Sequence, residues 1–120
     1  HAAGIKLALV SNTFVPGFAI DHELDRLGIG RFFEHRLYSS AFGVKKPSLT
    51  LFRAAIERVE ERPDQIWHVG DALVADVLGA RRAGIRPVLR RKGGRPPWWW
   101  PFRPEHTIDK LTDLLAILDL

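Results

Sequence analysis

Residues 66–80 constrain the fold of this chain more than any other stretch. An apolar run ends at Gly70-Asp71, and beyond it apolar residues recur at helical spacing as Leu73, Val77 and Ala80. The hydrophobic period therefore changes from about two, typical of a strand, to about 3.6, typical of a helix. A strand that passes directly into a helix is typical of α/β folds, whose strands lie parallel.

Two aspartates belong to this stretch. Asp71 directly follows the predicted strand, at the carboxyl end where open α/β sheets place their ligands. Asp76 lies in the first turns of the predicted helix. The residues leave two roles open for it: a helix cap, favoured by the helix dipole, or a second carboxylate in a metal-binding turn. His68, alone in an apolar strand, is expected to be a hydrogen-bonded core residue.

Polar residues also follow a second predicted strand. The apolar run at residues 5–10 predicts a buried parallel strand that ends in Ser11 and Asn12. A further short strand is expected at residues 37–40, ahead of a loop that contains Lys45 and Lys46. From the residues alone, a polar turn and two solvated lysines are the simpler interpretations.

Other elements can be placed by caps and periodicity. Asp21 is expected to cap a helix after a loop at residues 14–20, Ser48 to cap a second helix, and Asp109 to cap the last one. Residues 86–90 and 106–108 are predicted strands. The prolines of residues 92–105 exclude regular structure there. Three consecutive tryptophans, residues 98–100, carry too much apolar surface to stay exposed, so either their own domain or a second chain is expected to cover them.

Three segments together resemble the haloacid dehalogenase-like hydrolases. They are Val10-Ser11-Asn12-Thr13, Gly43-Val44-Lys45-Lys46-Pro47, and His68-Val69-Gly70-Asp71 followed by Asp76 and Gly79-Ala80, in the order of the family. The resemblance implies an α/β fold with a Rossmann-like parallel sheet and flanking helices. We expect one domain over residues 1–120: a motif-bearing α/β part at 5–91, a Pro/Trp-rich loop at 92–105, and a strand and helix at 106–120.

The resemblance also implies a chemistry. It suggests a Mg²⁺-dependent phosphatase that acts on a small phosphate ester. It assigns Ser11 and Asn12 to phosphate binding, Lys46 to phosphate binding and catalysis, and Asp71 and Asp76 to the metal. Lys46, rather than Lys45, is the candidate because it directly precedes the proline of its motif.

The nucleophile of the family has no counterpart in this sequence. That residue is an aspartate in an Asp-x-Asp motif on the first strand, and no such motif precedes Ser11. We therefore expect the second half of a core domain, with weak or no Mg²⁺ binding and no hydrolysis by the isolated chain. The sequence has no methionine, which also suggests a fragment, a processed product or a chain trimmed at its front.

A missing first strand would leave two buried strand edges, which proteins must cover. The two edges could pair with each other, a second chain could cover them, or an N-terminal segment could complete the sheet. We expect association with a second chain, and therefore a homo-oligomer such as a dimer.

Composition limits the remaining classes of function. The absence of cysteine excludes disulfides and suits a cytoplasmic protein. No apolar run is long enough to span a membrane. The net charge of +4 reflects basic residues crowded into the last third, which we interpret as solvated surface rather than a nucleic-acid site. The alternative function is a non-catalytic binding or assembly module that uses the tryptophan- and arginine-rich segment.

Overall fold

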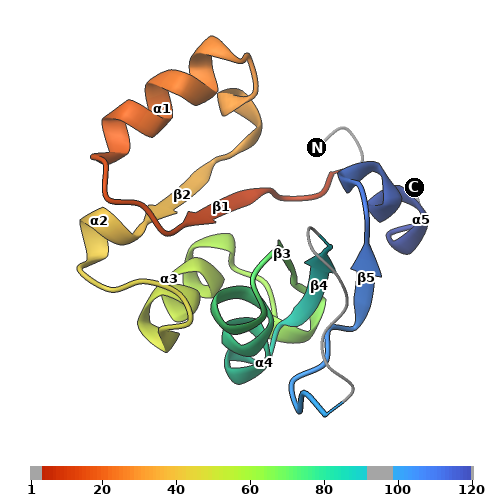
Figure 1. Ribbon diagram of the computed structural model, residues 1–120. Coiled ribbons are helices and arrows are strands. Elements are labelled where there is room, and N and C mark those ends of the chain that lie inside the picture. The colour runs from red at the N-terminus through yellow and green to blue at the C-terminus, as the bar shows by residue number, and fades with distance from the viewer. Residues whose placement is uncertain (1–3, 92–98, 120) are drawn as a thin grey trace. The chain divides into compact units, whose positions relative to one another are not determined.

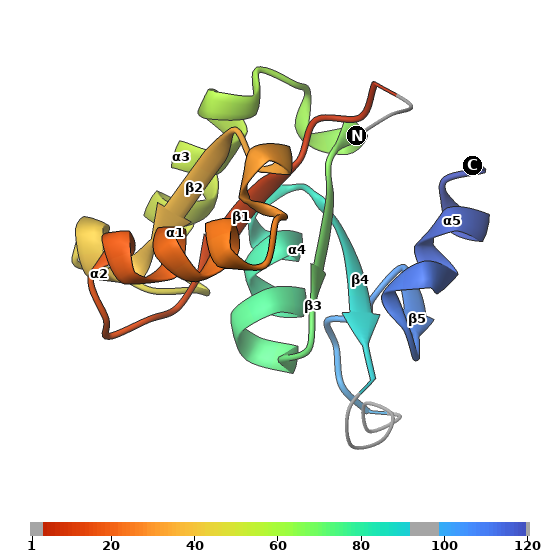
Figure 2. The same ribbon diagram turned by 90° about the horizontal axis from the view of Figure 1, so that it is seen from above.

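The computed structural model describes residues 4–91 and 99–119. The chain divides into two compact units, residues 1–61 and residues 62–120. Each unit contains parallel strands joined by helical connections, which confirms the α/β class (Figure 1; Figure 2). The single domain expected from the sequence stays a prediction.

The first unit is built on two parallel strands, β1 (Ala8–Ser11) and β2 (His35–Tyr38). Helix α3 (Leu49–Val59) packs against both strands, and its Leu51 and Phe52 are almost completely buried. The expected cap of α3 is confirmed, because the Ser48 hydroxyl accepts a hydrogen bond from the Thr50 N–H at 3.2 Å. Side-chain caps of this kind satisfy N–H groups that a helix start leaves unpaired.

Helix α1 (Gly17–Arg26) corrects one sequence prediction. It begins inside the segment expected to be a loop, with Pro16 as its N-cap residue and no side-chain cap. The fixed φ of proline suits the entry to a helix, so the proline starts this helix instead of excluding it. Asp21 is therefore not a cap. Its carboxylate lies within the helix and accepts hydrogen bonds from β2 side chains.

The second unit is a three-stranded parallel sheet in the order β3 (Trp67–Gly70), β4 (Arg86–Arg90) and β5 (His106–Ile108). After β3 the chain forms a π-helical segment, Leu73–Leu78, that continues as α4 (Gly79–Ala83). The buried apolar side chains of this unit are Val77, Ala80, Ile85, Val88, Leu89 and Ile108. The strand-to-helix transition predicted for residues 66–80 is confirmed, except that its first turn is π-helical.

The carboxyl-terminal helix differs from its prediction in cap and length. A 3₁₀ turn at Leu111–Asp113 leads into the short helix α5 (Leu114–Ile117). Asp113, not Asp109, provides the cap, since its carboxylate accepts hydrogen bonds from the N–H groups of Asp109 and Lys110, both at 3.1 Å. The Asp109 carboxylate binds Arg91 instead. Asp109 was predicted as the cap because an acidic residue before an apolar stripe is the usual signal.

The outer strands of each sheet keep an unpaired edge among the described residues, and β1 and β3 are two of them. Within residues 4–91 and 99–119, β1 pairs only with β2, and β3 pairs only with β4. Pairing of these two strands with each other stays a prediction, because they belong to different units. The exposed row of backbone donors and acceptors on such an edge readily accepts another strand.

The tryptophan segment is described only from Trp99 onward, and Trp98 lies outside the described residues. Trp99 is 62% exposed, whereas Trp100 packs edge-on against Phe102 with ring centroids 6.1 Å apart. Arg81 of α4 holds the segment by donating a hydrogen bond from Nε to the Arg103 carbonyl at 2.9 Å. Part of the aromatic surface is thus covered from within the unit. No helix among the described residues is long and apolar enough to cross a membrane.

Candidate functional site

The first candidate site is the turn after β1. Ser11 is the last residue of the strand, and Asn12 follows it. The Asn12 side chain pairs with the backbone of Lys46: its Oδ1 accepts from the Lys46 N–H at 2.8 Å, and its Nδ2 donates to the Lys46 carbonyl at 3.3 Å. The Lys46–Pro47 peptide bond is cis. These contacts bring the loop that contains Lys46 to the carboxyl end of β1. The sequence could not predict this pairing, because Asn12 and Lys46 are far apart along the chain.

A contact that sequence reasoning missed supports the same turn. Ser39 was expected in a strand, but it begins helix α2 (Ser39–Phe42). Its hydroxyl accepts a hydrogen bond from the Thr13 N–H at 2.8 Å and donates one to the Thr13 carbonyl at 3.0 Å. The backbone beyond Ser11 is therefore fixed from the end of the neighbouring strand. The sequence does show a serine, Ser39, directly after an apolar strand. That position does not indicate which backbone group the hydroxyl will bind.

The second candidate site is the turn after β3. Asp71 is exposed in a bend just past the strand, as the sequence predicts. Asp76 is 3% exposed, and its Oδ2 accepts a hydrogen bond from the Ala72 N–H at 3.1 Å. The N-cap residue of the segment is Ala72, so Asp76 is not the cap considered from the sequence but binds the N–H of the cap residue from within the segment. Its Oδ1 lies 2.9 Å from Nε2 of His68, which confirms His68 as a hydrogen-bonded residue of the strand.

Gly70 is required by the position of Asp76. A Cβ atom on Gly70 would lie 2.1 Å from Cγ of Asp76, closer than any stable contact between non-bonded atoms. The Asp76 carboxylate therefore packs directly on the backbone of β3, in space that only glycine leaves open. The Gly-Asp pair of the motif thus has two separate uses: the glycine accommodates Asp76, and Asp71 remains at the surface.

The site residues predicted from the sequence fall into two groups, one in each unit. Ser11, Asn12 and Lys46 belong to the first unit, and Asp71 and Asp76 to the second. Convergence of both groups on one pocket stays a prediction. Within the described residues, no cluster of three or more His, Cys, Asp or Glu side chains could hold a metal ion.

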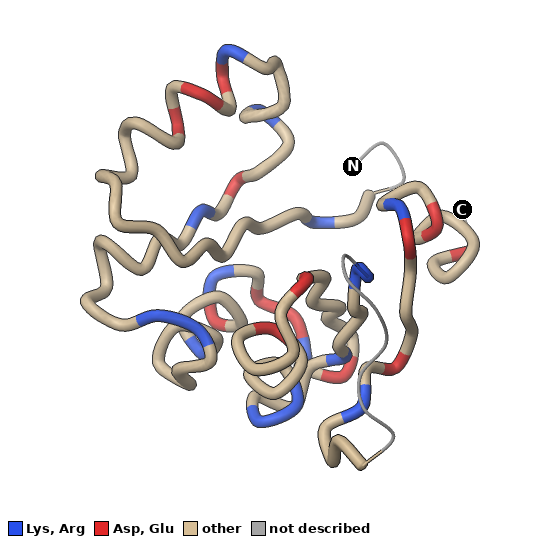
Figure 3. The backbone as a smooth tube through the Cα atoms, in the orientation of Figure 1, with Lys and Arg blue, Asp and Glu red and all other residues tan. Residues whose placement is uncertain are grey.

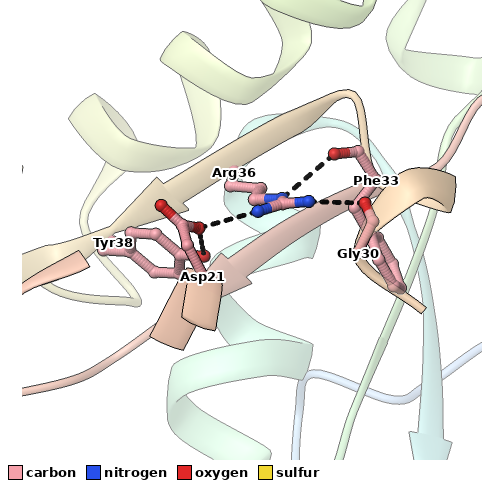
Figure 4. A network of polar contacts seen from close by, with 5 residues as sticks. All are labelled: Asp21, Gly30, Phe33, Arg36 and Tyr38. Carbon is pink, nitrogen blue, oxygen red and sulfur yellow. Dashed lines mark hydrogen bonds and ion pairs between the residues drawn. The ribbon is translucent and has the colours of Figure 1, made fainter. Parts of the chain in front are cut away.

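A polar cluster that the sequence did not predict lies in the first unit (Figure 4). The Asp21 Oδ1 atom accepts hydrogen bonds from the Tyr38 hydroxyl at 2.7 Å and from Arg36 at 2.9 Å. The same guanidinium also donates to the carbonyls of Gly30 and Phe33. The cluster borders an open cavity of about 520 Å³ beside α1 and β2. It fastens helix α1 and the turn after it to β2.

Titration of this cluster follows from its contacts. The Tyr38 hydroxyl, followed by the Arg36 guanidinium, lowers the pKa of the Asp21 carboxyl below its usual value. Burial, followed by the hydrogen bond to Asp21, raises the pKa of Tyr38 to about 12. Both shifts favour an ionised aspartate and a neutral tyrosine, the pair that the hydrogen bond requires.

The chain is similar in sequence to known hydrolases. The family model of the haloacid dehalogenase-like hydrolases matches residues 1–84. A glyceraldehyde 3-phosphate phosphatase of Methanopyrus kandleri is 38% identical over 120 residues, which cover 96% of this chain and 50% of that protein. The chain thus spans about half the length of this curated relative.

Solved structures show the same relationship. A haloacid dehalogenase (HAD) phosphatase from Thermococcus onnurineus superposes with a TM-score of 0.83 at 27% identity, covering 98% of this chain and 52% of that one. The magnesium-bound HAD-hydrolase YfnB from Bacillus subtilis superposes with a TM-score of 0.86 at 26% identity, covering 97% of this chain and 50% of that one. With its family model, its relatives and its fold in agreement, the chain belongs to the haloacid dehalogenase-like hydrolases.

Proposed function

We propose that this chain carries the phosphate-binding and metal-binding turns of a phosphatase that hydrolyses a small phosphate ester. The observation that supports this most directly is the pairing of Asn12 with the backbone of Lys46, because it sets an ammonium-bearing loop at the end of the strand that carries Ser11. A hydroxyl donor and a lysine side chain next to each other suit a phosphate oxygen.

The roles of these residues can be divided further. Ser11 would donate its hydroxyl to the phosphate, and Lys46 would neutralise charge on the phosphate and on the attacking group. Both polar atoms of the Asn12 amide already bind the lysine loop. Asn12 therefore acts in this proposal by positioning Lys46, and a direct phosphate contact is secondary.

Asp71 fits a magnesium ion better than Asp76 does. Mg²⁺ uses oxygen ligands and often keeps several waters beside one or two carboxylates. Asp71 is exposed at the end of β3, whereas both carboxylate oxygens of Asp76 face donors of the protein itself. Asp71 would hold the ion and Asp76 would support the turn. When bound, the ion would offset negative charge on the phosphate.

The substrate class follows from the relatives. The Methanopyrus relative is named for a phosphorylated three-carbon aldehyde, and we propose a phosphate ester of similar size for this chain. The sequence contains no Asp-x-Asp motif, so the nucleophilic carboxylate must come from another polypeptide segment. The unpaired strand edges within each unit are where a completing strand, from a second copy or a further segment, would add.

The test is a phosphate-release assay on the intact gene product that contains this chain, with small phosphate esters and Mg²⁺. We expect Asp71→Asn to lower kcat/KM by about 100-fold or more, since a charge-stabilising group is lost. The control is Asp64→Asn, which changes an exposed carboxylate that pairs with Arg62 and should leave the rate unchanged. Equal rates for Asp71→Asn and the parent would contradict the proposal.

A binding module that uses the aromatic segment is the second candidate, and the exposed Trp99 is the observation that favours it. Acidic residues lie among the basic ones along the backbone of both units (Figure 3). An inert intact gene product would favour this module. A nucleic-acid partner would then show a steep decrease of affinity with salt, and a flat salt response would exclude it.

A further inference from the structure

We propose that His68 is a positioning residue: it orients the Asp76 carboxylate, which in turn fixes the backbone of the turn that carries Asp71. The inference concerns the order of this turn. Only its consequence for cation binding rests on the function proposed above.

The contacts form one continuous path. Nε2 of His68 lies 2.9 Å from Oδ1 of Asp76, and Oδ2 of the same carboxylate accepts the Ala72 N–H at 3.1 Å. An ionised carboxylate can only accept, so in this proposal the histidine is the donor of the contact. Ala72 directly follows Asp71 and is the N-cap residue of the π-helical segment. The histidine is thus two hydrogen bonds away from the backbone next to Asp71.

Burial makes the orientation of this carboxylate matter. The Asp76 side chain is 4% exposed and that of His68 is 12% exposed, so water can scarcely replace either contact. The carboxylate also fills the space that Gly70 leaves open. In such surroundings, loss of a donor to a charged acceptor costs more than it does at a surface. Without the histidine donor, the carboxylate would turn away from the Ala72 N–H.

The π-helical segment explains why the turn needs this support. The N–H groups of Asp76 and Val77 both bind the Ala72 carbonyl, at 3.0 and 3.2 Å, so the first helical turn is wider than an α-turn. Wide turns of this kind are uncommon and occur often at functional sites. The Asp76 carboxylate adds a second link across this turn, because it accepts a hydrogen bond from the Ala72 N–H. Asp76 can therefore order the turn without itself contacting a ligand.

Amide hydrogen exchange of the 120-residue chain tests the inference without metal or substrate. His68→Phe keeps a ring of similar size but removes the donor, and we expect at least about a 10-fold faster exchange of the Ala72 amide. His68→Gln keeps an N–H donor at similar reach and should restore most of the protection. The Val88 amide of β4 reports global opening, and the change at Ala72 must exceed the change there.

His22→Phe is the matched control, because it makes the same substitution on an exposed position of α1. Unchanged Ala72 exchange in His68→Phe, or equal effects of His68→Phe and His68→Gln, would overturn the inference. If His68→Phe does not fold, His68→Gln becomes the deciding variant. In a folded His68→Gln chain, an Ala72 amide that exchanges as fast as an unstructured amide would also overturn the inference.

A Mg²⁺ titration, monitored by the amide signals of the turn, tests the functional consequence. We expect His68→Phe to weaken Mg²⁺ binding by about 10- to 100-fold, as is common when a group that orients a ligand is removed, and His68→Gln to recover most of it. If the parent chain binds no Mg²⁺, the proposed metal role of Asp71 fails for this chain, while the exchange experiment still decides the role of His68.

Discussion

Asp21 and Asp76 serve the same structural purpose in two different environments. Each carboxylate extends from a helical segment and makes two polar contacts with the strand or turn beside it. The Asp21 side chain is 41% exposed, whereas that of Asp76 is 4% exposed. Water can replace the partners of Asp21 but not those of Asp76. The difference in burial predicts that loss of the contact lowers stability less in the first unit than in the second.

The largest expected effect is at Gly70, beneath Asp76. Gly70→Ala should lower the free energy of unfolding by about 2–4 kcal/mol, because its Cβ would overlap the Asp76 carboxylate and displace it from its donors. Urea denaturation measures the loss. Gly28→Ala is the comparison: Gly28 has no atom within 4 Å but has a φ of +75°, so only backbone strain of about 1 kcal/mol is expected. Equal losses of unfolding free energy in Gly70→Ala and Gly28→Ala would contradict the prediction, because they would mean that the Asp76 side chain can move aside at no cost.

The second prediction compares the two carboxylates directly. Asp76→Asn should cost about 2–3 kcal/mol, because an amide cannot satisfy two facing donors in a buried site. Asp21→Asn should cost under about 1 kcal/mol, since solvent screens its ion pair with Arg36. Both variants are isosteric, and thermal or urea unfolding at neutral pH compares them. A cost at Asp21 that matches the cost at Asp76 would remove the distinction drawn from burial.

The third prediction uses the only tyrosine in the sequence, Tyr38, as a probe of the Asp21 cluster. Its pKa is raised to about 12 from 10.0, first by burial and then by Asp21. Tyrosine in the unfolded chain therefore loses its proton first. The contribution of Tyr38 to stability should be intact below pH 10.0 and lost as the pH rises from there to about 12.

Ultraviolet absorbance of the tyrosinate follows this titration in the folded chain. Asp21→Asn should lower the pKa of Tyr38 without returning it fully to the value of a free side chain, because burial remains. Glu23→Gln removes a carboxylate of the same helix that binds Arg26, and it should have no effect. A Tyr38 pKa that does not respond to Asp21→Asn would show that burial alone sets it.

The smallest effect is expected in an exposed part of the second unit. The Arg86 guanidinium lies 3.8 Å from the centre of the Trp67 ring, and its Nε donates to Glu105 at 2.9 Å. Arg86→Lys keeps the charge but loses the planar contacts that link β3, β4 and the start of β5. The urea midpoint should fall less than in Asp21→Asn. A larger fall would mean that this exposed stack contributes more than the Asp21 cluster.

Local pattern was sufficient to find the five strands and the turn after β3. The apolar run and the helical spacing beyond it placed β3 and set Asp71 directly after its end. The sequence pattern was insufficient where the same residue type can serve two structural roles. Pro16 was interpreted as part of a loop and begins a helix, and Asp109 was interpreted as a cap and binds Arg91. At Asp109 a contact outside the local sequence decided the outcome, whereas at Pro16 the fixed φ of the proline itself suits a helix start.

The sequence alone determined the family, the parallel α/β class and the strand ends on which polar residues lie, because periodicity and motif order are local properties of the chain. Tertiary structure decided which of those residues meet. The pairing of Asn12 with Lys46 joins residues far apart in sequence, and the burial of Asp76 against Gly70 depends on how the π-helical segment folds back on β3. Distances and burial of this kind arise from packing, in which each side chain takes its partners from whatever the fold brings beside it.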